Sequence, residues 1–275
     1  MKPARFDYVC AESLEEALEV LHQEGSDARV LAGGQTLLPL INMRMARPRV
    51  LIDIMRLAEL NRVESVNGVI RVGAAFRQGA LEQRTDLLSQ QPLLAAALPW
   101  IGHAQTRSRG TICGSVAHAD PSAELPLVLI ALGGEIELRS RANSRHVPAE
   151  KFFTGMMATD LGDDELIEAV RFPAARAGTG YAFREIGRRH GDFAIVACAA
   201  LVESGAAWLA VGGVADRPMA RKLPLPDDSA LDDALDDFAW DLNARDDLHA
   251  TAAYRRQLVR RLGRQTLEDA GRCRG

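Results

Sequence analysis

Two short segments rich in glycine and hydroxyl side chains constrain this chain more than any other feature of its sequence. The first is VLAGGQTLLPL, residues 30–40, and the second is RGTICGSVAHADPSAELP, residues 109–126. Glycine allows backbone angles that direct successive N–H groups toward one point, and a helix that follows such a turn adds its positive end. The two segments therefore favour a fold that binds an anion, and two loops suit a diphosphate better than one.

Neither segment matches a familiar nucleotide-binding motif. Both lack the Lys-Ser/Thr ending of a P-loop, and no G-x-G-x-x-G occurs in the chain, which argues against ATP hydrolysis and against Rossmann-type NAD binding. Taken alone, each glycine-bearing loop is also typical of an ordinary turn. Only the presence of both loops in one chain favours a ligand site.

The pattern of apolar residues predicts an α+β protein. A capping box at residues 13–16 begins an amphipathic helix that runs to about Gln23, and a β-loop-α-β unit then leads through the first glycine segment. Asn67-Gly68, between two alternating runs, predicts a β-hairpin with a tight turn. The small, turn-prone residues 173–179 are a candidate linker. Three further β-prone runs predict an antiparallel meander before a helical tail: 181–186, 193–202 and 207–211.

Composition argues against several classes of function. Lys and Arg number 33 against 37 Asp and Glu, a formal charge of −4, so the chain as a whole offers no electrostatic case for nucleic acid. Apolar stretches such as FAIVACAALV, residues 193–202, are too short to span a bilayer, and the N-terminal residues do not resemble a signal peptide. We therefore expect a cytoplasmic protein without a membrane span. The four cysteines lie far apart, which argues against a metal site or an iron–sulfur cluster in this chain.

The sequence is similar to a known family over nearly its whole length. AGGQTLLPLINMRMARP, residues 32–48, with VLIDI behind it, and the second glycine segment together resemble the FAD-binding medium subunit of molybdenum hydroxylases, the carbon monoxide dehydrogenase and xanthine dehydrogenase family. The likeness continues through FREIGRRHGDFAIVACAALV from Phe183 and into the helical tail. This pair of signatures is far more specific than a glycine pair.

The resemblance implies an α+β fold with a vanillyl-alcohol-oxidase-like FAD-binding domain at residues 1–175. That domain would consist of two lobes, at about 1–56 and 57–175. Residues 176–275 would form a smaller C-terminal α+β domain with a three-stranded antiparallel sheet and helices.

The resemblance also implies which residues hold FAD. The first loop and its flanks would cradle the diphosphate: Leu31, Ala32, Gly33, Gly34, Gln35, Thr36, Leu37 and Leu38. The second loop would contribute Thr111, Cys113, Gly114 and Ser115. Asp120 or Glu124 would accept hydrogen bonds from sugar or ribityl hydroxyls, and Leu161 and Arg184 would contact the adenine or the flavin.

One position departs from the family pattern, because Cys113 stands where the family usually has glycine. If the backbone there needed a positive φ, a side chain would add strain of about 1 kcal/mol and lower FAD affinity. In the alternative, Cys113 has ordinary backbone angles and packs as a small hydrophobic residue. The sequence leaves both alternatives open.

Several other residues are candidates for a role in catalysis or binding. His118 and His190 are candidate acid–base groups because of their residue type, but a flavin electron carrier removes no proton from an organic substrate, so we assign no catalytic residue. Phe193 could stack on a flavin, but its position at the start of a β-prone run favours the core. Asp53, at the end of VLIDI, is better explained as a cap or loop carboxylate than as a ligand.

The function that the resemblance implies is electron transfer in a larger enzyme. Iron–sulfur clusters in a small subunit would receive electrons from a molybdenum–pterin centre in a large subunit and pass them to FAD in this chain, which would deliver them to an external acceptor. The assembly expected is a dimer of heterotrimers. Two alternatives are a self-sufficient FAD oxidoreductase and a non-catalytic assembly module with a decayed flavin site.

Overall fold

The N-terminal part of the chain forms a small parallel sheet with two helices. The structure, a computed structural model, describes residues 2–274. The sheet has the order β1-β3-β2, and it and its helices have these bounds: β1 (Asp7–Cys10), α1 (Leu14–Glu24), η1 (Gly25–Asp27), β2 (Ala28–Leu31), α2 (Leu37–Asn42) and β3 (Val50–Asp53). The predicted N-cap is confirmed, because the Glu16 N–H donates to Ser13 Oγ at 3.1 Å, and Gly25 ends the helix. The Glu16 carboxylate accepts from the Glu12 N–H at 2.7 Å, one residue before the position that a full capping box would use.

A five-stranded antiparallel sheet forms the middle of the molecule, in the order β4-β5-β10-β6-β7. Its strands are β4 (Val63–Val66), β5 (Val69–Gly73), β6 (Glu135–Arg139), β7 (Ser144–Pro148) and β10 (Leu166–Pro173). The predicted hairpin is confirmed, because Asn67 and Gly68 both have positive φ, 51° and 75°, in the turn that joins β4 to β5.

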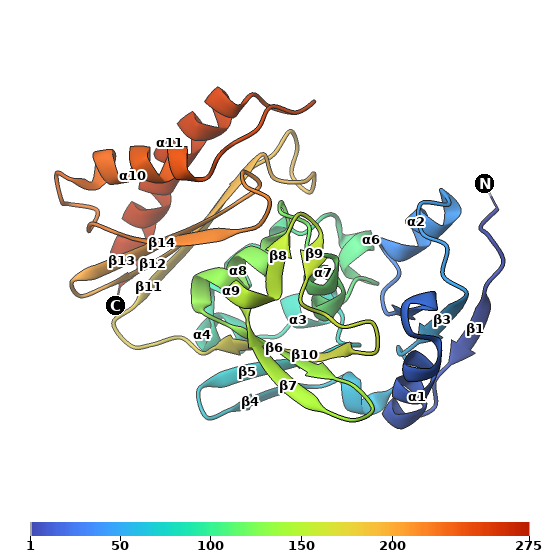
Figure 1. The fold of residues 1–275 in the computed structure, drawn as a ribbon. Coiled ribbons are helices and arrows are strands. Elements are labelled where there is room, and N and C mark those ends of the chain that lie inside the picture. Colours follow the sequence, from blue (N-terminus) through green and yellow to red (C-terminus); the bar gives the residue numbers. More distant parts are fainter. Residues whose placement is uncertain (1, 275) are drawn as a thin grey trace.

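Short helices and a small hairpin surround this middle sheet (Figure 1). The helices and 3₁₀ turns are η2 (Ala58–Leu60), α3 (Gln78–Glu82), α4 (Leu87–Gln90), α5 (Pro92–Ala97), η3 (Leu98–Trp100), α6 (Ala104–Arg107), α7 (Ile112–His118), α8 (Glu124–Leu132) and α9 (Ala149–Phe152), and the hairpin consists of β8 (Phe153–Gly155) and β9 (Ala158–Thr159). Helix α8 is apolar on all sides and almost wholly buried, as expected for a helix between two layers. It packs against α5 and α7 and against β12 and β13 of the third sheet.

The C-terminal part is an antiparallel meander of four strands in the order β11-β12-β13-β14. Its elements are β11 (Gly180–Ile186), β12 (Val196–Glu203), β13 (Ala206–Gly212), β14 (Met219–Leu223), α10 (Leu231–Asp241) and α11 (Ala252–Arg272). The three predicted strands are present, and β14 is a fourth that the three-stranded prediction missed. Helices α10 and α11 cover the face of this sheet that lies away from α8 (Figure 1).

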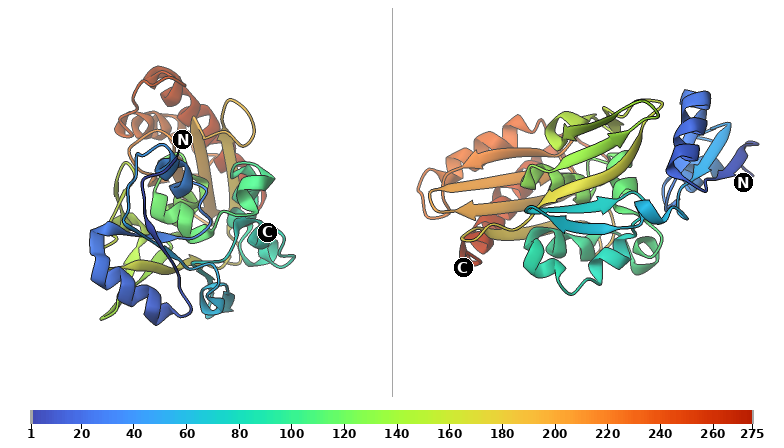
Figure 2. Two further views of the ribbon diagram at one scale, coloured as in Figure 1. Left: turned by 90° about the vertical axis from the view of Figure 1, so that its right-hand side faces the viewer. Right: turned by 90° about the horizontal axis from the view of Figure 1, so that it is seen from below.

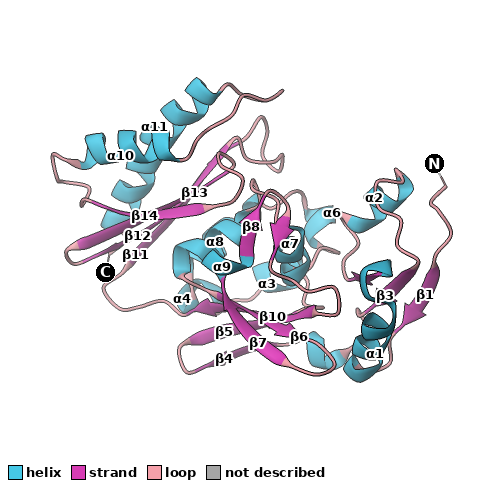
Figure 3. Ribbon diagram, viewed as in Figure 1, coloured by secondary structure: helices cyan, strands magenta, loops and turns pink. Residues whose placement is uncertain are grey.

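The apolar cores follow this arrangement of layers. One cluster of buried side chains runs from α1 through the middle sheet to α8 and one face of the C-terminal sheet, and a second lies between that sheet and α10 and α11. Figure 2 shows the N-terminal part (blue) at one end of the molecule and the C-terminal sheet (orange) at the other. Figure 3 shows helices and strands in every part of the molecule, and its two larger sheets are antiparallel, so the predicted α+β class is confirmed.

Candidate functional site

The first glycine-bearing loop connects β2 to α2. Gly34 has a φ of +69°, a left-handed conformation that few residues other than glycine adopt readily. The Gln35 side-chain amide donates to the Gly33 carbonyl at 3.2 Å, whereas Thr36, at the start of α2, makes no side-chain cap hydrogen bond. The loop is therefore a turn shaped by its backbone.

The second loop is the buried start of α7. Thr111 is 2 % exposed, and its Oγ1 accepts a hydrogen bond from the Gly114 N–H at 3.0 Å, which is the geometry of a helix N-cap. The start of α3 holds this loop in place, because the Gln78 N–H donates to the Gly110 carbonyl at 2.8 Å and Arg77, just before α3, forms a β-bridge with Thr111.

The two loops meet, although about eighty residues separate them in sequence. A Cβ added at Gly33 would overlap the carbonyl oxygen of Arg109 and lie 2.8 Å from the Cα of Gly110. Only glycine therefore fits at Gly33 without moving the backbone of the second loop.

A cavity of about 200 Å³ opens where the loops meet. Its wall contains residues of both loops and of their neighbours: Leu31, Ala32, Gly33, Gly34, Leu38, Asp53, Met55, Arg77 and Arg109. Two arginines against one carboxylate leave the wall positive. The volume is below the roughly 300–1,000 Å³ of pockets that enclose a drug-sized ligand, so this cavity matches a part of a dinucleotide, such as its diphosphate.

A second cavity lies beside the first and shares Arg77 with it. Its volume is about 390 Å³, and α3 and α6 form most of its wall. Arg107 in that wall is held by Glu82, with Nε and Oε2 2.7 Å apart, and donates to the carbonyl oxygens of Ile101 and Gly102. The first cavity is the better candidate site because only it includes both glycine-bearing loops.

Asp53 is a cap carboxylate, as the sequence suggested, and it also lines the first cavity. The Met55 N–H donates to its Oδ1 at 2.8 Å, and the Tyr8 hydroxyl donates to its Oδ2 at 2.6 Å. That hydrogen bond raises the pKa of Tyr8 to about 12, with desolvation and the charge of Asp53 adding to the rise. Arg77 and Arg109 were not predicted as site residues, although Arg109 is the first residue of the second glycine-bearing segment.

The backbone angles of Cys113 decide between the two alternatives that the sequence left open, backbone strain and ordinary packing. Among the described residues, five other than glycine have positive φ, and Cys113 is not one of them. It lies inside α7, is 3 % exposed, and its thiol contacts the Val72 carbonyl at 3.6 Å. Burial raises the pKa of this thiol well above its usual range. Cys113 therefore packs as a small hydrophobic residue, and the strain hypothesis is wrong.

The remaining residues of the second segment follow α7. Ser115 is half-buried in that helix, and Asp120 caps the next turn by accepting a hydrogen bond from the Ser122 N–H at 2.8 Å. His118 lies beside it, with Nε2 3.9 Å from Asp120 Oδ2. Glu124, at the first position of α8, is 6 % exposed. Burial raises its pKa to about 7, and the charge of Asp120 adds to the rise.

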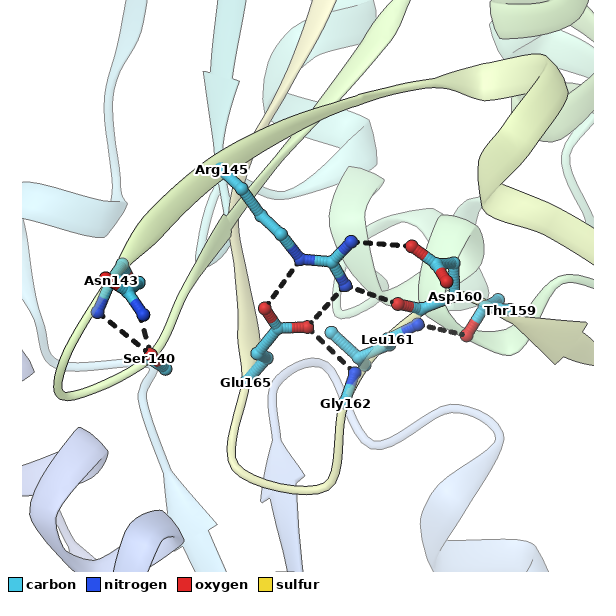
Figure 4. Close-up of polar contacts among 8 residues, drawn as sticks. All are labelled: Ser140, Asn143, Arg145, Thr159, Asp160, Leu161, Gly162 and Glu165. Atoms are coloured by element: carbon cyan, nitrogen blue, oxygen red, sulfur yellow. Dashed lines mark hydrogen bonds and ion pairs between the residues drawn. The ribbon is translucent and has the colours of Figure 1, made fainter.

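Leu161 lies in a tightly bound loop that follows β9, outside the wall of the first cavity. Figure 4 shows Arg145, which projects from β7, bound to this loop: both Glu165 oxygens lie 2.7 Å from its guanidinium, and the Asp160 carboxylate and carbonyl lie 2.6 Å from it. Glu165 also accepts a hydrogen bond from the Gly162 N–H at 2.8 Å. These contacts give the backbone around Leu161 a fixed shape.

Arg184 lies away from the first cavity, and Phe193 differs from the prediction. The Arg184 guanidinium lies against α11, where its Nε donates to Asp269 at 2.6 Å, and it is not in the wall of the first cavity. The expectation that Phe193 belongs to the core is wrong, because its side chain is 69 % exposed. The strand begins only at Val196, so Phe193 belongs to the loop between β11 and β12. In that loop His190 packs on Trp100, with ring centroids 4.9 Å apart.

Residues 2–274 lack two features that other classes of function would need. They contain no group of three or more His, Cys, Asp or Glu side chains placed to hold a metal ion. Over the same residues, no helix combines the length and apolar character needed to cross a membrane.

Comparisons with known proteins identify the family. The model of the family described as the FAD binding domain in molybdopterin dehydrogenase matches residues 4–175, and that of the CO dehydrogenase flavoprotein C-terminal domain matches residues 181–270. The chain belongs to the family of FAD-binding medium subunits of molybdenum hydroxylases. The chain is therefore a subunit of an FAD-dependent oxidoreductase.

Relatives in this flavoprotein family match over most or all of their length. The nicotine 6-hydroxylase medium subunit of Paenarthrobacter nicotinovorans is 34% identical over 98% of this chain and 99% of its own. The 6-hydroxypseudooxynicotine dehydrogenase complex subunit alpha of the same organism is 43% identical over 74% of this chain and 68% of its own. Among solved structures, carbon monoxide dehydrogenase from Hydrogenophaga pseudoflava matches with a TM-score of 0.90, 31% identity and full coverage of both chains.

The residues of this flavoprotein suit the diphosphate of FAD. Bare glycine backbone lines the first cavity, and among the described residues its wall carries two arginines and one carboxylate.

Proposed function

We propose that this chain binds FAD where its two glycine-bearing loops meet and acts as the electron-transfer subunit of a molybdenum hydroxylase. The contact of Gly33 with the backbone of Arg109 and Gly110 carries the proposal, because it brings both loops to one cavity. The chain receives electrons from iron–sulfur clusters of a small subunit and delivers them to an external acceptor. The organic substrate reacts at a molybdenum centre in a large subunit.

The proposed cofactor contacts are those that the family resemblance named, with additions from the structure. The backbone of residues 32–36 and the start of α7 hold the diphosphate, and Arg77 and Arg109 supply the positive charge beside it. Leu31 and Leu38 form the apolar part of the wall. Bound FAD supplies the redox chemistry through its isoalloxazine ring, and the protein contributes binding and orientation.

The remaining proposed contacts come from residues outside the wall of the first cavity. Asp120 and Glu124 accept hydrogen bonds from hydroxyl groups of the cofactor, and Leu161 lies in the rigid loop around Arg145. The 69 % exposure of Phe193 leaves its ring available to cover the flavin. Arg184 is already paired with Asp269, so its contact with the cofactor would require that pair to open.

We further propose the domain boundaries 1–175 and 176–275, and a dimer of heterotrimers as the assembly. Relatives named as subunits of complexes support the presence of partner subunits. Co-purification from the native cell tests the assembly: an iron–sulfur subunit and a molybdenum subunit in equal amounts would support it. A self-sufficient FAD oxidoreductase would instead purify alone, yellow, and reduce its flavin with an organic substrate.

The arginines allow a test of the FAD site that leaves the loops intact. Replacing both Arg77 and Arg109 by methionine should weaken FAD binding at least about tenfold, because each charge-assisted hydrogen bond to an anion contributes about 1.5–3 kcal/mol. Flavin fluorescence during titration of the purified chain measures the affinity. Arg261→Met, an exposed position on α11, is the matched control. Unchanged affinity in the double variant would contradict the site, and a wild-type chain that cannot be reconstituted with FAD would favour the assembly module.

A further inference from the structure

The first cavity lies at the edge of the N-terminal sheet where its parallel strands end. Leu31, the last residue of β2, pairs in register with Asp53, the last residue of β3. The first glycine-bearing loop follows Leu31 directly, so the loop begins beside Asp53. Ligands of open sheets with parallel strands bind outside these carboxyl ends. Asp53 therefore stands where a ligand of the loop would arrive.

The order of the elements around the loop is that of a unit that binds a mononucleotide. A strand, a glycine-bearing turn, a helix and a second parallel strand follow one another as β2, residues 32–36, α2 and β3. In dinucleotide-binding folds with this order, an acidic residue about 20 positions after the glycines accepts a hydrogen bond from a ribose hydroxyl, while the turn holds the diphosphate. Asp53 ends the second strand at about that distance from Gly34. The G-x-G-x-x-G signature is absent, but the placement of the carboxylate is equivalent.

Asp53 is held in one orientation and still faces the first cavity. The Met55 N–H donates to its Oδ1 at 2.8 Å, and the hydroxyl of Tyr8, from β1, donates to its Oδ2 at 2.6 Å. A carboxylate offers about four acceptor sites, so two donors leave it able to accept further hydrogen bonds. Asp53 is only half-buried and forms part of the cavity wall. A ligand in the cavity can therefore reach its carboxylate.

The charges of the wall select different parts of a ligand. Arg77 and Arg109 attract a phosphate, whereas Asp53 repels a phosphate and accepts hydrogen bonds from neutral donors. A diphosphate next to a sugar with free hydroxyl groups satisfies all three side chains. The ribose ring holds two neighbouring hydroxyl groups in place for one carboxylate, whereas an open ribityl chain would lose more conformational freedom on binding. The wall consequently favours the ribose of the adenosine half.

We propose that Asp53 is a specificity-determining residue of the FAD site, whose carboxylate accepts hydrogen bonds from the ribose hydroxyl groups of the adenosine half. Tyr8 is a positioning residue, because its hydroxyl holds that carboxylate in place. This inference rests on the proposed FAD site and adds to it two residues that the family resemblance did not include. It also gives the cofactor a direction, with the adenosine half at the N-terminal sheet.

The test compares FAD with flavin 2′,3′-dideoxyadenine dinucleotide, which lacks both ribose hydroxyl groups, by fluorescence titration of the full chain. The wild type should bind FAD at least about tenfold more tightly than this analogue, because hydrogen bonds to a charged acceptor are lost with the hydroxyl groups. In Asp53→Asn the side chain keeps its size and an acceptor for the Met55 N–H but loses its charge. Its preference for FAD should fall to about threefold, since neutral hydrogen bonds are about half as strong as charge-assisted ones.

Asp228→Asn is the matched control. Asp228 is an exposed carboxylate that also accepts a hydrogen bond from the backbone N–H two residues further on, that of Ala230, at 2.9 Å. It lies outside the wall of the first cavity. This variant should keep the full preference of the wild type for FAD over the dideoxy analogue.

The outcomes separate the ribose contact from the FAD site itself. A wild type that binds FAD and the analogue equally, or an Asp53→Asn variant that keeps the full preference, would overturn the proposal and leave the FAD site standing. A wild-type chain that binds neither dinucleotide would refute the proposed function together with this contact. The comparison of the two ligands on the wild type involves no substitution, so it decides the question even where Asp53→Asn fails to fold.

Discussion

The first glycine-bearing loop relies on backbone freedom, whereas the second relies on a buried helix cap. Gly34 in the first loop adopts a left-handed φ, and Thr36 makes no cap hydrogen bond. In the second loop Thr111 is buried and caps α7, and Gly114 has an ordinary helical backbone. The two segments look alike in sequence because both combine glycine with threonine, but different interactions hold them in shape.

The difference explains why a cysteine is tolerated in the second loop. Cys113 occupies a helical position whose side chain enters the core beside Val72, so a Cβ is accommodated there. No such space exists at Gly33, where the facing backbone of Arg109 is already in contact. Similar motifs can therefore accept side chains at one position and exclude them at another.

The largest effect is expected from Gly33→Val. Its Cβ would overlap the Arg109 carbonyl, so the two loops would have to separate, with a loss of about 3 kcal/mol or more in the free energy of unfolding. Chemical denaturation measures this loss, and FAD binding should vanish as well. Gly155→Val is the matched control, since the nearest heavy atom to its Cβ would be 3.9 Å away. Wild-type stability of Gly33→Val would show that the loops do not touch.

A smaller effect is expected from Cys113→Gly. Glycine inside a helix costs about 1 kcal/mol relative to alanine, and the lost buried side chain contributes a similar amount, so the variant should be about 2 kcal/mol less stable. FAD affinity should stay unchanged, because the side chain points into the core. Denaturant unfolding and flavin titration measure the two quantities, with Cys113→Ala separating the sulfur from the helix effect. A tighter and more stable variant would revive the strain hypothesis.

Local signals predicted the local structure well. Ser13 and Gly25 bound α1, and Asn67-Gly68 forms the hairpin turn, because each depends on residues within a few positions of one another. The fourth strand of the C-terminal sheet was missed because MARKL, residues 219–223, is an edge strand with charged side chains, so it lacks an apolar pattern. Phe193 was misassigned because a continuous apolar run does not mark the residue where its strand begins.

The site required information that local patterns do not carry. Arg77 reaches the first cavity only because β5 and α3 bring it beside Thr111, and no spacing in the sequence indicates that approach. The faces of β11 show the same limit. Alternation predicts that Arg184 and Glu185 diverge, but only the packing of α11 and α8 shows which of them faces the FAD-binding side. The family resemblance supplied the identity of the loops, and the structure supplied their contact.

The smallest effect comes from a matched pair of threonine variants, one in each loop. Thr111→Ala should lower the free energy of unfolding by about 1 kcal/mol, because it removes a buried N-cap from α7. Thr36→Ala should leave stability unchanged, because Thr36 makes no cap hydrogen bond to lose. Thr111→Ser, which keeps the hydroxyl, should recover most of the loss. Equal losses in the two alanine variants would mean that both loops are held by caps, and the contrast between a backbone turn and a capped helix would then have to be abandoned.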